Sequence, residues 1–213
     1  MAGITRDYID RGIQRAEKGQ HLDLPPIHGL SSHKVRSLLN WLCKLPRTNY
    51  LEIGTHIGST LIPALWGNPH VTATCIDLWT GWEGAKRANL EANLIKYLPG
   101  RPINIIEGDM FTVDLAQVSS GVTVYFYDGP HSDEGHYQAF VRYDPVFADR
   151  FVAVVDDWNW EWARIQTPRA FADLGYTVEA SWELPATPAQ DSERWWNGVY
   201  VAIVRKQDVR PPG

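Results

Sequence analysis

The sequence predicts an α/β fold in which a mostly parallel sheet ends in an antiparallel hairpin. From residue 50 onward, short β-rich runs alternate with helical stretches, which is typical of βαβ units. The last two strand candidates follow each other with only a polar loop between them. Because parallel neighbours need a long crossover, strands joined in this way are expected to be antiparallel. Five strand–helix units and a hairpin give one domain with a seven-stranded sheet.

The expected elements follow from local composition and length. The predicted strands are 50–53, 71–77, 103–107, 122–127, 151–155, 177–184 and 198–205. The predicted helices between them are 58–66, 84–98, 111–118, 132–148 and 160–174. Two of the strand runs, VTVYFY at 122–127 and FVAVV at 151–155, are almost continuously apolar. Such runs are typical of central strands that are buried on both faces.

The first 46 residues are expected to form a helical extension that packs on the domain of residues 47–213. An apolar stripe with the spacing of one helix face consists of Val35, Leu38, Leu39 and Leu42. Ser31 and Ser32 are the candidate caps at its start, and Pro46 ends it. A weaker helix is predicted for residues 4–18.

Composition and charge exclude several classes of protein. The chain has 213 residues, 44% of them hydrophobic, and no apolar run approaches the roughly 20 residues of a membrane span. Its 25 acidic and 20 basic residues give a net charge of −5, so nucleic acid is not expected as a partner. The N-terminus MAGITRDYIDRG has no apolar signal core, and the two cysteines have no metal-type spacing. We therefore expect a cytoplasmic protein with reduced thiols, and a homo-oligomer stays open.

Glycines and acids follow the first three predicted strands. The first strand leads into Glu52, Gly54 and Gly58, in a G-x-x-x-G pattern that differs from the G-x-G-x-x-G of dinucleotide enzymes. Such glycines also occur in an ordinary tight turn. Asp77 ends the second strand and Asp109 follows the third, so both lie at the carboxyl edge of the sheet, where α/β folds bind ligands. Ordered acids at this edge favour a nucleoside site over isolated helix caps.

On these motifs the sequence resembles the class I S-adenosylmethionine-dependent methyltransferases. The resemblance rests on YLEIGTHIGS at 50–59, CIDLW at 75–79 and EGDM at 107–110. It implies a Rossmann-like domain in which the glycine loop passes the amino-acid part of the cofactor, Asp77 holds the ribose and Asp109 holds the adenine. The cofactor-binding residues that it implies are Glu52, Gly54, Thr55, Gly58, Ser59, Asp77, Leu78, Trp79, Gly108, Asp109, Met110 and Asp128. Trp79 and Trp82 are the two candidates to cover the adenine, and packing against the next helix is an equal alternative.

A second group of acids follows the fourth and fifth strands. Asp128 begins DGPHSDEGHY, and Asp156 and Asp157 end VVDDW. Three crowded carboxylates repel one another unless a cation or a shared proton compensates, and oxygen ligands suit Mg²⁺. The alternative is that Asp156 or Asp157 caps the following helix.

This second constellation is similar to the small-molecule O-methyltransferases of the macrocin and novobiocin type and to cephalosporin-hydroxylase-like proteins. The similarity implies a divalent metal, Mg²⁺ or another ion, held by Asp128, Asp156 and Asp157. Novobiocin-type enzymes carry a further acid where this chain has Pro130 and His131. We therefore expect Asp128, His131 and Asp157 to be catalytic, with His131 as the base, although a hydrogen bond within the turn is an equal alternative for this histidine.

The predicted function is divalent-metal-assisted O-methylation of a small hydroxylated molecule, either a sugar or an aromatic natural product. A nicotinamide-dependent oxidoreductase and a non-catalytic cofactor-binding protein are the alternatives. We expect Trp158 and Trp160 to form a substrate wall. The loop before the last strand, with Trp195, Trp196 and Asn197, is expected at the opposite end or at the rim of the sheet.

Overall fold

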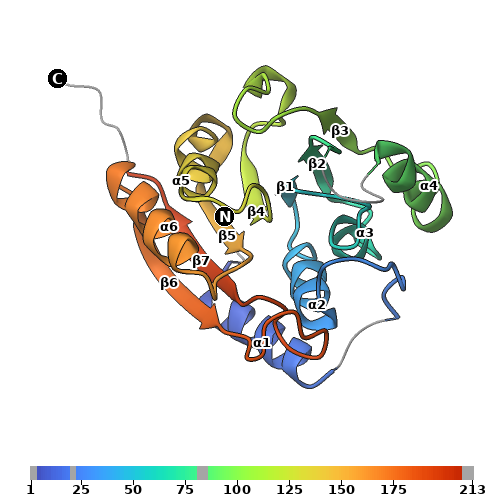
Figure 1. Ribbon diagram of the computed structural model, residues 1–213, viewed down its shortest axis with the longest axis horizontal. Helices are drawn as coiled ribbons and strands as arrows, with labels where there is room; N and C mark the ends of the chain where they lie inside the picture. Colours follow the sequence, from blue (N-terminus) through green and yellow to red (C-terminus); the bar gives the residue numbers. More distant parts are fainter. Residues whose placement is uncertain (1–3, 20–22, 81–85, 208–213) are drawn as a thin grey trace.

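The computed structural model describes residues 4–19, 23–80 and 86–207, which contain a single seven-stranded sheet (Figure 1). The strand order is β3-β2-β1-β4-β5-β7-β6. The strands are β1 (Asn49–Ile53), β2 (Thr72–Asp77), β3 (Asn104–Glu107), β4 (Val122–Tyr127), β5 (Phe147–Val155), β6 (Thr177–Leu184) and β7 (Val199–Arg205). Strands β1 to β5 are parallel, whereas β7 is antiparallel to both β5 and β6. The predicted α/β fold, with its mostly parallel sheet and C-terminal hairpin, is confirmed.

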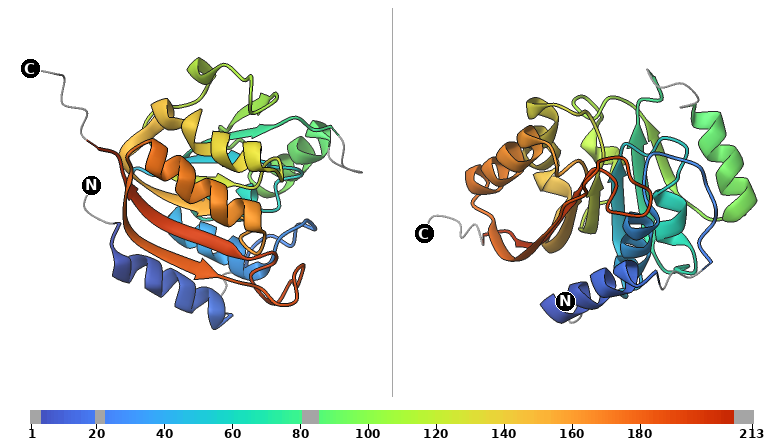
Figure 2. Two further views of the ribbon diagram at one scale, coloured as in Figure 1. Left: turned by 60° about the vertical axis from the view of Figure 1, so that its left-hand side comes forward. Right: turned by 60° about the horizontal axis from the view of Figure 1, so that its bottom comes forward.

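Helices cover both faces of the sheet (Figures 1 and 2). The α-helices are α1 (Arg6–Glu17), α2 (His33–Leu42), α3 (Leu61–Leu65), α4 (Arg87–Tyr97), α5 (Asp133–Val141) and α6 (Glu161–Asp173). Helices α1 to α4 contribute to one buried cluster, in which Leu38 and Leu61 join Phe126 of the sheet. Helices α5 and α6 contribute to the other, where Phe140 joins Tyr125. Alternate residues of one strand thus enter opposite layers, which explains why the central strands are almost uniformly apolar.

Three of the predicted helices are wrong in extent. The stretch predicted as helix 111–118 contains only the 3₁₀ turn η1 (Leu115–Gln117), where the side chain of Asp114 accepts a hydrogen bond from the backbone of Ala116. The stretch 132–148 contains helix α5, a 3₁₀ turn η2 (Asp144–Val146) and the start of β5, because Pro145 interrupts helical hydrogen bonding. The stretch 58–66 keeps only α3, since Gly58 has a φ of 87°.

Helix α1 connects the N-terminal segment to both α2 and the C-terminal strands. Tyr8 donates from its hydroxyl to the carbonyl of Trp41 (2.5 Å), and the Trp41 indole donates to the carbonyl of Tyr8 (2.9 Å). Asp10 accepts from the indole of Trp182 on β6, and Glu17 accepts from the indole of Trp195 before β7. Figure 2 shows α1 (blue) alongside β6 and β7, on the face opposite α6 (orange).

The direction of β7 decides what lies at the carboxyl edge of the sheet. Val155, at the end of β5, is paired with Tyr200, near the start of antiparallel β7. The loop that precedes β7 therefore meets the loop that follows β5, and Trp158 donates from its backbone to the carbonyl of Gly198 (3.0 Å). The expectation that these two loops lie at opposite ends or only at the rim is wrong. An antiparallel partner begins where its neighbour ends.

Both cysteines, Cys43 and Cys75, are free and buried. Within the described part of the chain, no helix has the length and hydrophobicity needed to cross a bilayer.

Asn40 offers a test of how α2 is fixed to α3. Its amide donates to the carbonyls of Pro63 (2.8 Å) and Trp66 (2.7 Å), and both Asn40 and its neighbour Asn68 are buried. We predict that Asn40→Ala lowers the free energy of unfolding by about 2–4 kcal/mol, because two carbonyls lose a buried donor. Urea denaturation measures this, and Ile95→Ala, at an exposed position of α4, serves as the control. Equal stability of the two variants would show that the hydrogen bonds of Asn40 do not stabilise the packing of α2 on α3.

Candidate active site

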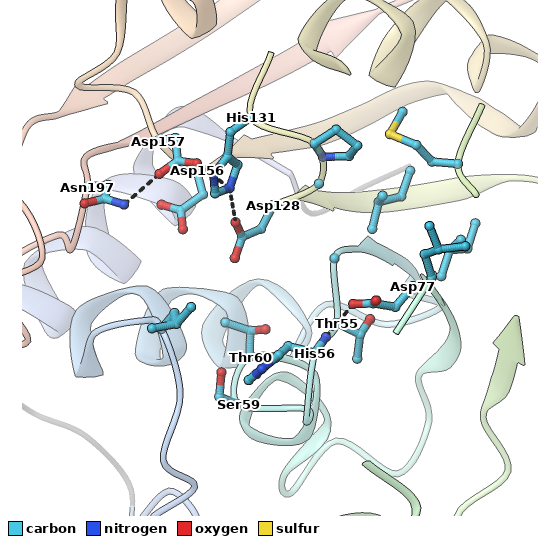
Figure 3. Close-up of a pocket in the computed structure, with 18 of the residues that line it drawn as sticks. Thr55, His56, Ser59, Thr60, Asp77, Asp128, His131, Asp156, Asp157 and Asn197 are labelled. Carbon is cyan, nitrogen blue, oxygen red and sulfur yellow. Dashed lines mark hydrogen bonds and ion pairs between the residues drawn. The ribbon is translucent and has the colours of Figure 1, made fainter. Parts of the chain in front are cut away.

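The loops at the carboxyl edge of the sheet enclose a cavity of about 780 Å³. Its wall is formed by the loops after β1, β2, β3, β4 and β5, by the loop before β7, and by Leu30 ahead of α2. This volume is in the range that encloses a drug-sized ligand. Figure 3 shows two groups of side chains facing each other across the cavity, one around Asp77 and one around Asp128.

The loop after β1 is held in its shape by residues at the end of β2. His56 has a φ of 51°, and its backbone N–H donates to Asp77 Oδ2 at 2.7 Å. Asp77 Oδ1 accepts from the backbone N–H of Trp79, and the Trp79 indole donates to the carbonyl of His56, both at 2.7 Å. A left-handed conformation at a non-glycine residue is strained, and these three hydrogen bonds hold it in place.

Gly54 is required by close approach as well as by conformation. Its φ is 87°, and a Cβ at this position would lie 1.7 Å from the carbonyl oxygen of Asp128. The backbone after β1 therefore runs directly against the backbone after β4. This contact brings the two halves of the cavity together, and only glycine allows it.

The cavity contains most, but not all, of the residues predicted to bind a cofactor. Those that line it are Gly54, Thr55, Ser59, Asp77, Leu78, Gly108, Asp109, Met110 and Asp128. Glu52, Gly58 and Trp79 are not in its wall. Trp79 is 8% exposed and faces the loop after β1, whereas Leu78 is 47% exposed in the cavity. Trp82 lies outside the described residues.

Glu52 is fully buried beneath the loop after β1. Its carboxylate accepts hydrogen bonds from the hydroxyls of Tyr50 and Thr60. Burial raises the pKa of Glu52 to about 8, against the opposing effect of these two hydroxyl donors. Glu52 was predicted to bind the cofactor, but it does not line the cavity. It instead supports the loop after β1 from below.

His131 lies between two carboxylates on the other side of the cavity. Its Nε2 is 2.9 Å from Asp157 Oδ2 and 3.6 Å from Asp128 Oδ1. The hydrogen bonds to Asp128 and Asp157 raise the pKa of His131 to about 10, although burial opposes this. Burial, with the charge of Asp157, raises the pKa of Asp128 to about 7, against the effect of His131. The structure therefore brings together the three residues predicted to be catalytic.

Asp157 is fixed from two sides. Burial acts to raise its pKa, but the hydrogen bonds from His131 and Asn197 prevail and lower it. The Asn197 amide donates to Asp157 Oδ1 at 2.7 Å, which links the loop before β7 to the end of β5. Sequence reasoning did not assign a role to Asn197, because the contact depends on the direction of β7.

Asp156 also lines the cavity, but its surroundings differ. The residue is 2% exposed, and its Oδ1 has no hydrogen-bond partner within the described part of the chain. Burial, reinforced by the charges of Asp128 and Asp157, raises its pKa well above the ordinary value. The predicted metal ligands were Asp128, Asp156 and Asp157. Among the described residues, the group with ligand atoms within 4.8 Å of one another is instead Asp128, His131 and Asp157.

Aromatic side chains form the remaining wall of this half. Trp160 lines the cavity as predicted, but Trp158 is buried and stacks on Tyr200, with 4.2 Å between ring centroids. Trp162 and Trp196 also line the cavity. Sequence analysis missed their place in the wall. The i, i+2 spacing of Trp160 and Trp162 at the start of α6 was the available signal.

Comparisons with known proteins identify the fold. No family model and no curated protein matches the chain. An O-methyltransferase from Bacillus cereus, solved with S-adenosylhomocysteine, has a TM-score of 0.60 at 13% identity, covering 96% of this chain and 94% of that one.

Two further solved structures are similar. The O-methyltransferase TomG from Streptomyces achromogenes, solved with S-adenosylmethionine and involved in tomaymycin synthesis, has a TM-score of 0.59 at 16% identity, covering 96% and 92%. A candidate RNA methyltransferase from Pyrococcus horikoshii has a TM-score of 0.56 at 16% identity, covering 92% and 98%. The chain thus has the Rossmann-like fold of class I S-adenosylmethionine-dependent methyltransferases, as the sequence resemblance predicts.

Because burial raises the pKa of Glu52, we expect this residue to make the free energy of unfolding fall as the pH rises. Its pKa rises from an ordinary value of 4.5 to about 8 on folding, so the folded chain binds the proton more tightly than the unfolded chain. The contribution to stability is complete below pH 4.5 and is lost as the pH rises toward 8, at about 1.4 kcal/mol per pH unit.

We predict that Glu52→Gln becomes progressively more stable relative to the unmutated protein as the pH rises from 5 to 8. Thermal unfolding at a series of pH values measures this difference. Glu193→Gln, at an exposed site, is the control. A constant difference for Glu52→Gln would contradict the raised pKa.

Proposed function

We propose that the chain is an S-adenosylmethionine-dependent methyltransferase that methylates a hydroxyl oxygen of a small molecule. The observation that carries this proposal is the continuity of the cavity from Asp77 and Asp109 to the cluster of Asp128, His131 and Asp157. A donor held by the first set of residues faces an acceptor held by the second.

The cofactor half of the cavity suits a nucleoside. Asp77 faces it, and each carboxylate oxygen of Asp77 accepts one backbone hydrogen bond and retains a lone pair for a ribose hydroxyl. Asp109 is positioned by accepting from the backbone of Phe111 at 2.9 Å. Leu78 offers exposed apolar surface for the flat face of an adenine.

The chemistry requires alignment and removal of one proton. The methyl carbon leaves the sulfonium sulfur, which keeps the C–S electron pair and becomes a neutral thioether. The carbon bonds to the acceptor oxygen as the hydroxyl proton passes to a base. His131 is the base in this proposal, with Asp157 and Asn197 fixing the imidazole in position.

A divalent metal fits the same half of the cavity. The buried Oδ1 of Asp156 has no partner in the described part of the chain, and Asp128 and Asp157 lie beside it in the wall. Asp128, Asp156 and Asp157 would hold the ion, which would then take the place of the contacts that His131 makes with Asp128 and Asp157, as oxygen ligands suit Mg²⁺. When bound, such an ion supplies positive charge that lowers the pKa of a nearby hydroxyl. Without such an ion, the imidazolium of His131 is the positive charge beside Asp128 and Asp157, so His131 can accept the hydroxyl proton only after it has lost its own.

Asp77 provides the first test. We predict that Asp77→Ala weakens binding of S-adenosylhomocysteine by about 1.5–3 kcal/mol, because a charged acceptor of ribose hydroxyls is lost. Isothermal titration calorimetry measures this, with the exposed Asp149→Ala as a control. Trp79→Phe removes one hydrogen bond from His56 but keeps Asp77. If Trp79→Phe weakens binding less than Asp77→Ala does, the loss in Asp77→Ala comes from the ribose contact and not from a change in the shape of the loop.

The same titration decides the broader proposal. If the unmutated protein binds neither S-adenosylmethionine nor S-adenosylhomocysteine, the proposed function is wrong. Quenching or enhancement of nicotinamide fluorescence on mixing would then support an oxidoreductase. Binding without transfer of labelled methyl groups to a metabolite library, with and without Mg²⁺, would indicate a non-catalytic binding protein.

Asp157 provides the second test. We predict that Asp157→Ala binds S-adenosylhomocysteine with nearly unchanged affinity but loses about 10²–10⁴-fold in methyl transfer, because alignment and proton removal fail together. Excess chelator should have the same effect on the unmutated protein. Radiolabelled methyl transfer measures both, with Asp149→Ala as the control. Full activity in chelator would refute the metal and leave His131 as the base, with Asp157 holding its imidazole.

A further inference from the structure

The cavity is lined by acidic side chains and by no lysine or arginine among the described residues. The half of the cavity around Asp128, His131 and Asp157, where the acceptor would bind, is called the acceptor half. Five aspartates line the whole cavity, namely Asp77, Asp109, Asp128, Asp156 and Asp157. Among the described residues of the wall, none is lysine or arginine. Phosphate and carboxylate groups are generally held by arginine or lysine, because charge-assisted hydrogen bonds offset their desolvation. The wall thus offers an anion neither arginine nor lysine, and its His131 is already paired with Asp128 and Asp157.

Nearby arginines are already engaged by the backbone. The guanidinium of Arg36 donates to the carbonyls of Ile27 (2.8 Å) and Ser31 (3.3 Å), which flank the segment that carries Leu30. Arg164 on α6 donates to the carbonyls of Trp158 (2.9 Å) and Asn159 (2.6 Å). Both cations hold loops of the cavity in place, and recruiting either for an anion would leave those carbonyls without a donor.

An aromatic series leads from the exposed part of this half to the catalytic cluster. Trp160 is 43% exposed and lies nearly parallel to Trp162, with 6.4 Å between ring centroids and 19° between planes. Trp162 lies nearly parallel to His131, at 6.1 Å and 13°. A large exposed aromatic surface in the wall of a cavity gains from being covered by another flat ring.

We propose that the acceptor is a hydroxylated ring compound without phosphate or carboxylate groups, whose ring packs on Trp160 while its hydroxyl reaches Asp128, His131 and Asp157. This inference rests on the proposed methyltransferase function and narrows its substrate class. It sets aside nucleic acids, coenzyme A esters and sugar phosphates as acceptors. Trp160 becomes the residue that determines specificity.

The first experiment compares matched ring compounds on the protein saturated with S-adenosylhomocysteine. A library of hydroxylated rings contains each compound in neutral form and as its phosphate or carboxylate counterpart, for example 3,4-dihydroxybenzaldehyde with 3,4-dihydroxybenzoate, and methyl glucoside with methyl glucoside 6-phosphate. Saturation-transfer NMR reports binding, and labelled S-adenosylmethionine reports methyl transfer. We expect neutral members to bind and to be methylated, and each anionic partner to be at least tenfold weaker.

The second experiment changes Trp160. For the best neutral acceptor, Trp160→Ala should raise KM about tenfold with little change in kcat and none in the affinity for S-adenosylhomocysteine, because the ring contact is lost. Trp160→Phe should restore much of the affinity, since it keeps an aromatic face. Ile165→Ala, at an exposed apolar site on α6, the helix that follows Trp160, should change nothing.

The outcomes separate this inference from the proposed function. If S-adenosylhomocysteine does not bind, the proposed function itself fails. If it binds but anionic members bind as well as their neutral partners, or no neutral ring binds, the inference on substrate class is wrong and the methyltransferase proposal stands. An unchanged KM in Trp160→Ala would remove Trp160 from acceptor recognition.

Discussion

Negative charge at the ends of β4 and β5 is the constraint on which the candidate site depends. Asp128, Asp156 and Asp157 lie together at a buried edge, where like charges repel strongly and water gives little screening. His131 lies between Asp128 and Asp157, and Asn197 donates to Asp157 from the opposite side. These contacts from His131 and Asn197 compensate the negative charge and tie the loops after β4 and before β7 to the end of β5.

The other half of the cavity depends on hydrogen bonding to a strained turn. Asp77 and Trp79 hold the backbone of His56 in a left-handed conformation, so the end of β2 fixes the loop after β1. Gly54 lets this loop run against the backbone of Asp128. The half of the cavity around Asp77 and the half around Asp128 therefore meet at the backbone contact between Gly54 and Asp128. The proposed methyl transfer would depend on this arrangement, because its rate requires two reactants held in line at a fixed separation.

The wall of the acceptor half is assembled from distant parts of the chain. The loop before β7 is fixed to α1 through Trp195 and Glu17, and to the end of β5 through Asn197 and Asp157. Helix α1 thus supports a loop that lines the cavity, although α1 itself lies on the outer layer of the sheet (Figure 2).

Sequence alone determined the elements whose signal is local. The alternation of strand and helix patterns and the apolar runs predict the sheet, because the hydrophobic period of a segment and its burial are visible in neighbouring residues. Strand-end acids such as Asp77 and Asp128 could be placed at one edge, since parallel strands all end on the same side. Tertiary structure alone decided which side chains meet. The antiparallel β7 brings Asn197 to Asp157. Trp79 has a left-handed backbone conformation and is buried, whereas its neighbour Leu78 is exposed in the cavity. Glu52 is buried beneath the loop after β1 and does not reach the cavity. Each of these depends on contacts between residues far apart in the chain, which local patterns do not encode.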